Sequence, residues 1–163
     1  MKRVVSTLLA LSLVGLLAST AFAAASDTIT VNYEVEAINE LNIDGASVTL
    51  TVSSATAGSA PDQASDATTY DITTNCAADA KKITGAINTT MPGGLTLQAN
   101  MTAPTGGSSA GATTLTDVAA NLVTLIDGVA ESNIVLAFTL DATAAAGVVA
   151  AASKTCTLTI ADS

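Results

Sequence analysis

The sequence predicts an all-β protein, a single antiparallel β-sandwich of about eight short strands that follows a cleaved signal peptide. Segments in which apolar and polar residues alternate recur along the chain, and turn-forming residues separate them. Threonine repeatedly occupies the polar positions of these segments. A series of short strands divided by turn-rich loops is typical of a sandwich rather than of a fold that alternates strands with helices.

The start of the chain has the features of a secretory leader. Basic residues precede an apolar stretch, and the small residues Ala21 and Ala23 then fit a signal-peptidase site. The apolar stretch is shorter than the about 20 residues that a membrane-spanning helix needs. We therefore predict a signal peptide over 1–23, cleaved after Ala23, and a sandwich domain over 24–163. The mature protein is expected to be extracellular, periplasmic or at the cell surface, with no stable membrane span.

Composition excludes several classes of function. The 163 residues suffice for one domain and include no histidine, which argues against hydrolases with a histidine base and against histidine-rich metal sites. Lys and Arg number 5 against 14 Asp and Glu, so the chain lacks the basic surface that nucleic acids require. We expect no enzymatic activity, no cofactor and no nucleic-acid partner.

The two cysteines, Cys76 and Cys156, allow a single pairing within the chain. Export favours a disulfide, and each cysteine falls on the apolar face of a strand-like segment, so both sulfurs are expected to point inward. Such a bridge would stabilise the fold by about 4 kcal/mol through loop-closure entropy. A redox-active pair would favour a C-x-x-C motif, which the sequence lacks. The sequence therefore predicts a structural disulfide.

The first predicted strand of the mature chain covers 28–38 and is half-buried. Turn residues at 42–45 follow it, then a strand over 47–53 and a long exposed loop over 54–66. The apolar face of the first strand carries Ile29, Val31, Tyr33, Val35 and Ala37. Later strands are predicted over 68–75, 82–89, 95–102, 133–141 and 154–161.

The connections between the later strands are predicted from their turn chemistry. The sequence Met-Pro-Gly-Gly at 91–94 predicts a turn that joins 82–89 and 95–102 as a hairpin. Residues 115–127 fit either a short helix or a strand, and we favour the strand. The alanine-rich stretch 142–153 permits a helix, but Gly147 and the β-branched residues after it interrupt one.

The C-terminal residues carry a family resemblance. The sequence of 142–149, followed by that of 155–160, resembles the closing hairpin of secreted bacterial β-sandwiches. These families include spore-coat-U-like and other fimbrial subunits, and the cell-surface domains named after a Trp-x-Leu motif. The resemblance implies an immunoglobulin-like extracellular module that assembles by lending a strand to a neighbour.

Acidic residues provide the remaining candidates for chemistry. Glu34 and Glu36 share the polar face of the first strand, as a carboxylate pair of a glycosidase would, but such a site also needs a cleft lined by aromatic residues. A solvated strand face explains the pair. The aspartates that flank loops and could bind calcium are Asp62, Asp66, Asp71 and Asp79, although no Asp-x-Asp-x-Asp-Gly loop is present.

These observations favour a non-enzymatic structural protein, a fimbria-like or matrix subunit whose partners are further copies or other surface proteins. The alternative is an extracellular, adhesin-like binding module for glycans or proteins. The strand over 28–38 is either an edge strand of its own sandwich or a donor strand that pairs with the next subunit. Alternation alone does not distinguish these two pairings.

Overall fold

The computed structural model describes residues 25–76 and 80–163, so the predicted leader and its cleavage site at Ala23 lie outside the described residues. The chain divides into two units. The first ends at Glu34, and its described part, 25–34, is extended with no regular secondary structure. The second unit, from Val35 to Ser163, contains all the strands described below.

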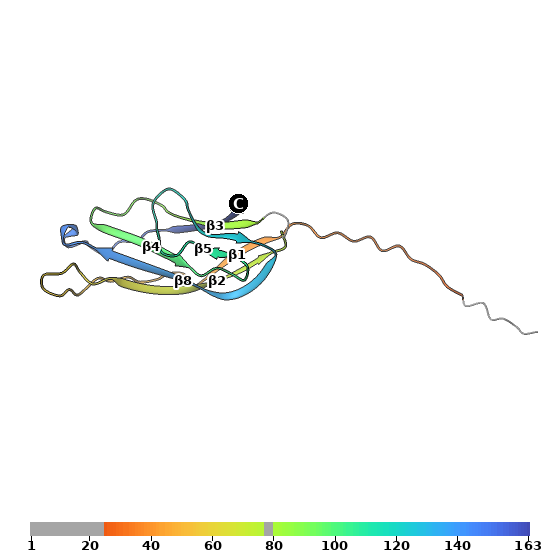
Figure 1. Cartoon of the computed structure of the whole chain (residues 1–163), viewed down its shortest axis with the longest axis horizontal. Helices are drawn as coiled ribbons and strands as arrows, with labels where there is room; N and C mark the ends of the chain where they lie inside the picture. The colour runs from red at the N-terminus through yellow and green to blue at the C-terminus, as the bar shows by residue number, and fades with distance from the viewer. Residues whose placement is uncertain (1–24, 77–79) are drawn as a thin grey trace, which may run out of the picture. The chain divides into compact units, whose positions relative to one another are not determined.

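Two antiparallel sheets face each other in the second unit and form the predicted β-sandwich (Figure 1). The first sheet has, in spatial order, β1 (Asn39–Asp44), β2 (Ala64–Thr74), β8 (Val129–Ala142), β4 (Leu95–Met101) and β6 (Thr113–Thr114). The second has β5 (Ser108–Ser109), β7 (Ala120–Ile126), β3 (Lys81–Ile87) and β9 (Cys156–Asp162).

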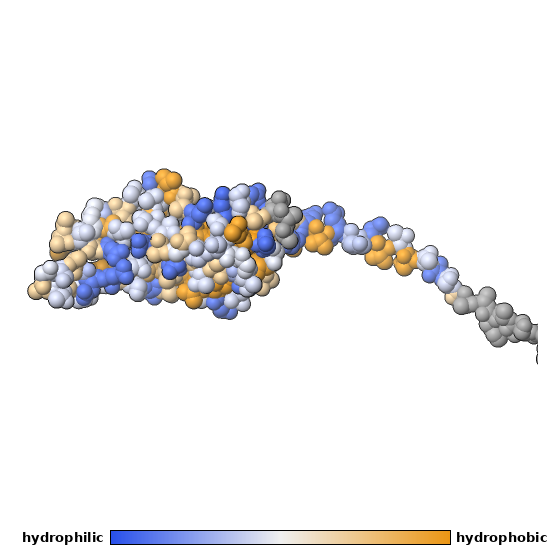
Figure 2. Space-filling view, in the orientation of Figure 1, coloured by the Kyte–Doolittle hydropathy of each residue, from blue (hydrophilic) through white to orange (hydrophobic). Residues whose placement is uncertain are grey.

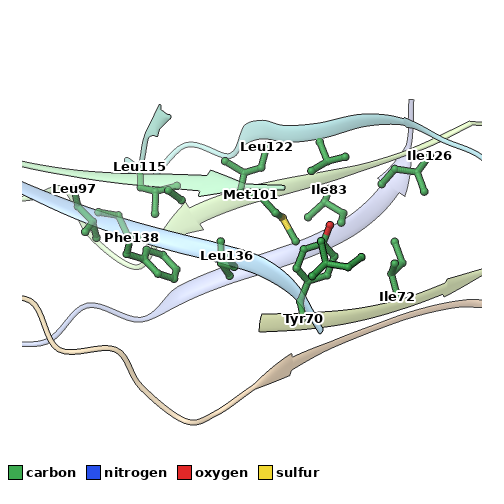
Figure 3. Close-up of a cluster of buried hydrophobic side chains, with 14 residues drawn as sticks. Tyr70, Ile72, Ile83, Leu97, Met101, Leu115, Leu122, Ile126, Leu136 and Phe138 are labelled. Atoms are coloured by element: carbon green, nitrogen blue, oxygen red, sulfur yellow. The ribbon is translucent and has the colours of Figure 1, made fainter. Parts of the chain in front are cut away.

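Side chains from both sheets meet in one hydrophobic core (Figure 3). Alternate residues of each strand supply it, as period-2 patterning requires. Tyr70 lies fully buried in this core, and its hydroxyl donates a 2.6 Å hydrogen bond to the carbonyl of Thr102. The largest fully buried side chains are Tyr70, Ile72, Ile83, Met101, Leu115, Leu122, Val123, Ile126 and Leu136.

Most of the later strands confirm the sequence patterns. The predicted strands over 68–75, 82–89, 95–102, 133–141 and 154–161 correspond to β2, β3, β4, β8 and β9. The stretch 115–127 contains the strand β7, so the strand alternative is the right one. The alanine-rich connection forms only a 3₁₀ turn, Ala144–Ala146. Among the described residues, no helix has the length and apolar character to cross a membrane.

The predicted hairpin of β3 and β4 is wrong. β3 pairs with β7 and β9 in one sheet, whereas β4 pairs with β8 and β6 in the other. The connection through 91–94 therefore crosses between the layers. Turn residues specify that the chain bends, but they do not specify which layer the next strand joins.

The predicted strand over 47–53 forms no ladder, although its burial alternates as expected. Val48, Leu50 and Val52 are half-buried, and the threonines between them are exposed. The backbone N–H of Thr49 donates to the Asp66 carboxylate at 2.8 Å, and this bond and one from Ala67 N–H lower the pKa of Asp66. The side chain of Asp66 therefore binds the backbone of this segment, where the sequence pattern predicted pairing with another strand.

The first strand begins later in the chain than predicted. Residues 28–38 form no strand, and β1 begins only at Asn39, extending through the predicted turn 42–45 as far as Asp44. The reason lies in the partner strand, because Asn39 pairs with Thr74, the last residue of β2. Residues before Asn39 extend beyond the last residue of β2 and have no strand beside them to pair with. The apolar residues predicted to face inward, Ile29, Val31, Tyr33, Val35 and Ala37, are exposed.

The predicted disulfide is absent, since Cys76 and Cys156 are both free thiols. Cys76 follows the end of β2 shortly before β3 begins at Lys81, whereas Cys156 pairs with Ile87 at the other end of β3. The length of β3 corresponds to about 20 Å at the usual rise of a strand. A disulfide joins Cα atoms only about 4.4–6.8 Å apart. The sequence pattern predicted an inward face for each cysteine. The structure places the two cysteines at opposite ends of the sandwich.

The turn before β4 offers a test of the fold. Gly94 has φ +81°, and a Cβ there would lie 2.8 Å from the backbone of Ala146. We expect Gly94→Ala to lower the free energy of unfolding by about 2–4 kcal/mol, measured by urea denaturation. Gly93→Ala is the matched control, because a Cβ there meets nothing within 4 Å, and it should leave stability unchanged or slightly raised. Equal effects of the two changes would contradict this turn geometry.

Candidate functional site

An open groove lies between the edge strands of the two sheets. β1 is the terminal strand of the first sheet and β9 that of the second, so within the described residues each strand has one side without a strand partner. The groove between them has a volume of about 420 Å³, and Leu136 and Phe138 from β8 contribute to its lining. An adjoining hollow of about 490 Å³ continues past Cys156 toward Lys154.

The hydrophobic core is incompletely covered at this groove. Apart from Ala103 and Val129, every partly buried hydrophobic residue packed against the core lines the groove or the adjoining hollow. These residues are Leu41, Ile43, Val48, Leu50, Met91, Cys156, Leu158 and Ile160. An apolar strip of this kind favours a binding surface, because folding has left apolar area in contact with water.

The backbone of β9 is oriented to accept another strand. The carbonyl of Thr155 accepts a hydrogen bond from Asn88 N–H, and Ser163 N–H donates to the carbonyl of Ala80. Odd-numbered residues of β9 therefore direct their backbone polar groups toward β3, since these groups alternate in direction along a strand. Even-numbered residues direct theirs to the open side, and Cys156, Leu158 and Ile160 are the half-buried ones among them.

β1 presents the same arrangement from the other side of the groove. Asn75 N–H donates to the carbonyl of Ile38, and Asn39 pairs with Thr74 in the ladder with β2. By the same alternation, Leu41 and Ile43 direct their backbone polar groups away from β2 and into the gap. Both walls thus combine half-buried apolar side chains with backbone groups that can pair with an added strand.

Charged side chains lie at both ends of β9. Lys154 precedes the strand, and its ammonium donates to Thr89 Oγ1 at 2.5 Å and to the carbonyl of Thr90 at 2.9 Å. At the other end the exposed carboxylate of Asp162 accepts a hydrogen bond from the buried Lys81 ammonium. That hydrogen bond and the charge of Lys81 lower the pKa of Asp162. Lysine side chains are therefore present at both ends of the strand.

The segment over 28–38 has the alternating pattern of a β-strand, yet it pairs with no strand among the described residues. Its exposed fractions are 88% for Ile29, 71% for Val31, 91% for Tyr33 and 77% for Val35. Figure 2 shows apolar side chains alternating with polar ones along this extended segment. Glu34 and Glu36 are also exposed on it. The two glutamates considered as a carboxylate pair are thus solvent-exposed, as their explanation by a solvated face expects.

The two cysteines occupy distinct parts of this site. Cys156 lines both hollows, and burial raises the pKa of its thiol. Cys76 follows Asn75, whose side chain accepts from Ile38 N–H at 2.8 Å and donates to the Glu36 carbonyl at 2.7 Å. Extending the β1–β2 register by two residues places Cys76 beside Ala37. One thiol is thus in the groove, and the other is at the base of the exposed segment.

Of the acidic residues considered for calcium, Asp79 lies outside the described residues, and the other three serve as hydrogen-bond acceptors. Asp62 accepts from the Ser54 hydroxyl at 2.6 Å, and Asp71 accepts from Asn133 N–H at 2.9 Å. In the part of the chain that the structure describes, no three Asp, Glu, Cys or His side chains gather closely enough to hold a metal ion.

A scan against models of known protein families found no match, and a search of curated proteins found none either. The groove and the exposed segment are therefore the features on which a function can be argued. Sequence reasoning found the segment but missed the groove. Leu41 was not assigned to any inward face and Ile43 was assigned to a turn, and no signal in the sequence marks β9 as the end of a sheet.

Proposed function

We propose that the protein is a non-enzymatic structural subunit of the cell surface or extracellular matrix, whose copies assemble by β-strand donation. The segment over 28–38 of one copy adds to the open side of β9 in the next copy. One observation carries the proposal: the same chain exposes an alternating strand-like segment and an open groove that lacks such a strand.

The segment and the groove are complementary in pattern. In an antiparallel register with Val31 opposite Ile160, Tyr33 lies opposite Leu158 and Val35 opposite Cys156. All these side chains then face the core, since residues directly opposite each other share one face of a sheet. Burying each exposed Val, Ile or Tyr contributes about 1.5–3 kcal/mol, so several are needed to exceed the cost of association, about 4–15 kcal/mol.

The positions of Lys154 and Asn39 favour donation to a neighbouring copy. Antiparallel pairing with β9 places Glu36 next to the ammonium of Lys154. Insertion into the chain's own groove would be parallel and would take Glu36 away from Lys154. The reason is that the segment ends at Asn39, opposite the last residue of β2, and the next strand, β3, begins opposite Asp162 at the end of β9. Donation to another copy joins two different surfaces, and such a contact repeats into an open filament.

The exposed segment allows a direct test in the exported protein. Val31→Asp is expected to raise the concentration needed for assembly at least about 100-fold, because a carboxylate would enter the apolar groove. Deletion of 28–37 should abolish assembly. Negative-stain microscopy and sedimentation velocity measure both effects.

Thr30→Asp is the matched control, since it adds the same charge to the polar face of the same segment. It should assemble nearly as well as the unchanged protein. Equal loss of assembly in Val31→Asp and Thr30→Asp would contradict insertion of the apolar face, and copies that stay monomeric at high concentration would contradict donation between copies.

A binding module for glycans has weaker support. Of the aromatic residues that the structure describes, Tyr70 and Phe138 are buried and Tyr33 alone is exposed. Sugar sites generally use aromatic side chains as stacking platforms, and one tyrosine on an extended segment does not provide a concave one.

A further inference from the structure

We propose that Asn75 is a positioning residue for strand donation: its side-chain amide holds the base of the donated segment extended, with one edge free to pair. This inference rests on the proposed strand donation, because it assigns to the donor a residue that prepares its segment for insertion. Asn75 acts through the backbone of its own chain rather than by binding the receiving copy.

Asn75 continues the pairing of β1 with β2 beyond the end of β2 at Thr74. Its backbone N–H donates to the carbonyl of Ile38 at 3.2 Å. Its side-chain oxygen accepts from Ile38 N–H at 2.8 Å, and its side-chain nitrogen donates to the Glu36 carbonyl at 2.7 Å. One side chain therefore bonds to the backbone of the segment as a neighbouring strand would, as far as Glu36.

These hydrogen bonds determine which edge of the segment stays free. They engage the backbone of the even-numbered residues Glu36 and Ile38 on the edge that faces β2. Backbone polar groups alternate in direction along an extended chain, so those of Val35 and Ala37 lie on the opposite edge. In the antiparallel register described above, odd-numbered residues of the segment lie opposite even-numbered residues of β9, whose backbone groups point to its open side. The edge that Asn75 leaves free is thus the edge that must pair with β9.

Holding the base of the segment extended lowers the cost of insertion. A segment whose base is already ordered loses less conformational freedom when it binds, which strengthens binding without any new contact between copies. Asn75, Glu36 and Ile38 are all exposed, so their hydrogen bonds are not part of the hydrophobic core. Removing the Asn75 side chain should therefore weaken donation and leave the stability of the monomer nearly unchanged.

Asn75→Ala tests this role in the exported protein. It should raise the concentration needed for assembly about 10-fold, because the base of the segment must then be ordered during insertion. The matched control is Asn100→Ala, the same change at an exposed asparagine of β4, which β2 and β8 separate from β1. The control should assemble as the unchanged protein does. Sedimentation velocity measures assembly, and urea denaturation should show that neither variant loses stability.

The same change can be placed in one partner of a single contact at a time. A copy with Leu158→Pro can donate but not receive, because proline removes the N–H that Leu158 directs to the open side of β9. A copy with Val31→Asp can receive but not donate. Asn75→Ala in the donating copy should raise the dissociation constant of this dimer about 10-fold, whereas in the receiving copy it should leave the constant unchanged. Isothermal titration calorimetry measures both constants.

Equal weakening from both copies would show that Asn75 supports the sandwich rather than the donated segment. That result would overturn the inference, as would an unchanged dissociation constant when the donating copy carries Asn75→Ala, and both results would leave strand donation intact. Absence of a dimer between Leu158→Pro and Val31→Asp copies that both keep Asn75 would overturn strand donation itself.

Discussion

Tyr70→Ala is expected to lower the free energy of unfolding by about 3–5 kcal/mol, as removal of a large aromatic side chain from a packed core does. Tyr70 is fully buried in the core that side chains of both sheets form (Figure 3). A small domain has about 5–15 kcal/mol of stability in total, so this variant approaches the limit of folding. Urea denaturation followed by circular dichroism measures the change.

The chain contains a matched control in its other tyrosine. Tyr33 is 91% exposed, so Tyr33→Ala should leave the stability of the monomer unchanged while weakening assembly. Tyr70→Phe keeps the ring but removes the donor to the Thr102 carbonyl, and should cost about 1–3 kcal/mol. If Tyr33→Ala destabilised the monomer as much as Tyr70→Ala, the segment over 28–38 would have to be part of the chain's own sandwich.

Much of the fold could be predicted because alternation directly encodes burial. The pattern of 95–102 became β4, and that of 133–141 became part of β8. Alternation does not encode partners, however. It is equally strong in 28–38, which has no strand partner, and in 154–161, which became β9 at the end of a sheet. The groove arises from the absence of a neighbour, and a single sequence has no signal for that absence.

The cysteines illustrate the same limit. Strand parity predicted that Cys156 would face inward, and its side chain does line the groove. Alternation repeats every two residues along a strand. It therefore predicts which face of the sheet a residue occupies, but not how far along the sandwich the residue lies. The separation of Cys76 and Cys156 depends on the register of β2, β3 and β9, which is decided by contacts between segments far apart in the sequence.

A mixture of two deficient variants is expected to form dimers and nothing larger, although each variant alone stays monomeric. The donor-deficient variant is Val31→Asp, which keeps an intact groove. The acceptor-deficient variant is Leu158→Pro, which keeps an intact segment. Leu158 directs its N–H to the open side of β9, so proline removes a hydrogen bond to the incoming strand without removing one to β3.

Head-to-tail donation requires this result, because only one contact can form in the mixture: the segment of the Leu158→Pro copy in the groove of the Val31→Asp copy. Sedimentation velocity distinguishes dimers from monomers and filaments. Leu158→Ala separates the effects of side chain and backbone, since it removes the apolar contact but keeps the N–H, and it should weaken assembly less than proline does. Circular dichroism verifies that each variant folds. A mixture that stays monomeric would contradict strand donation, because the intact segment of one variant would then fail to bind the intact groove of the other.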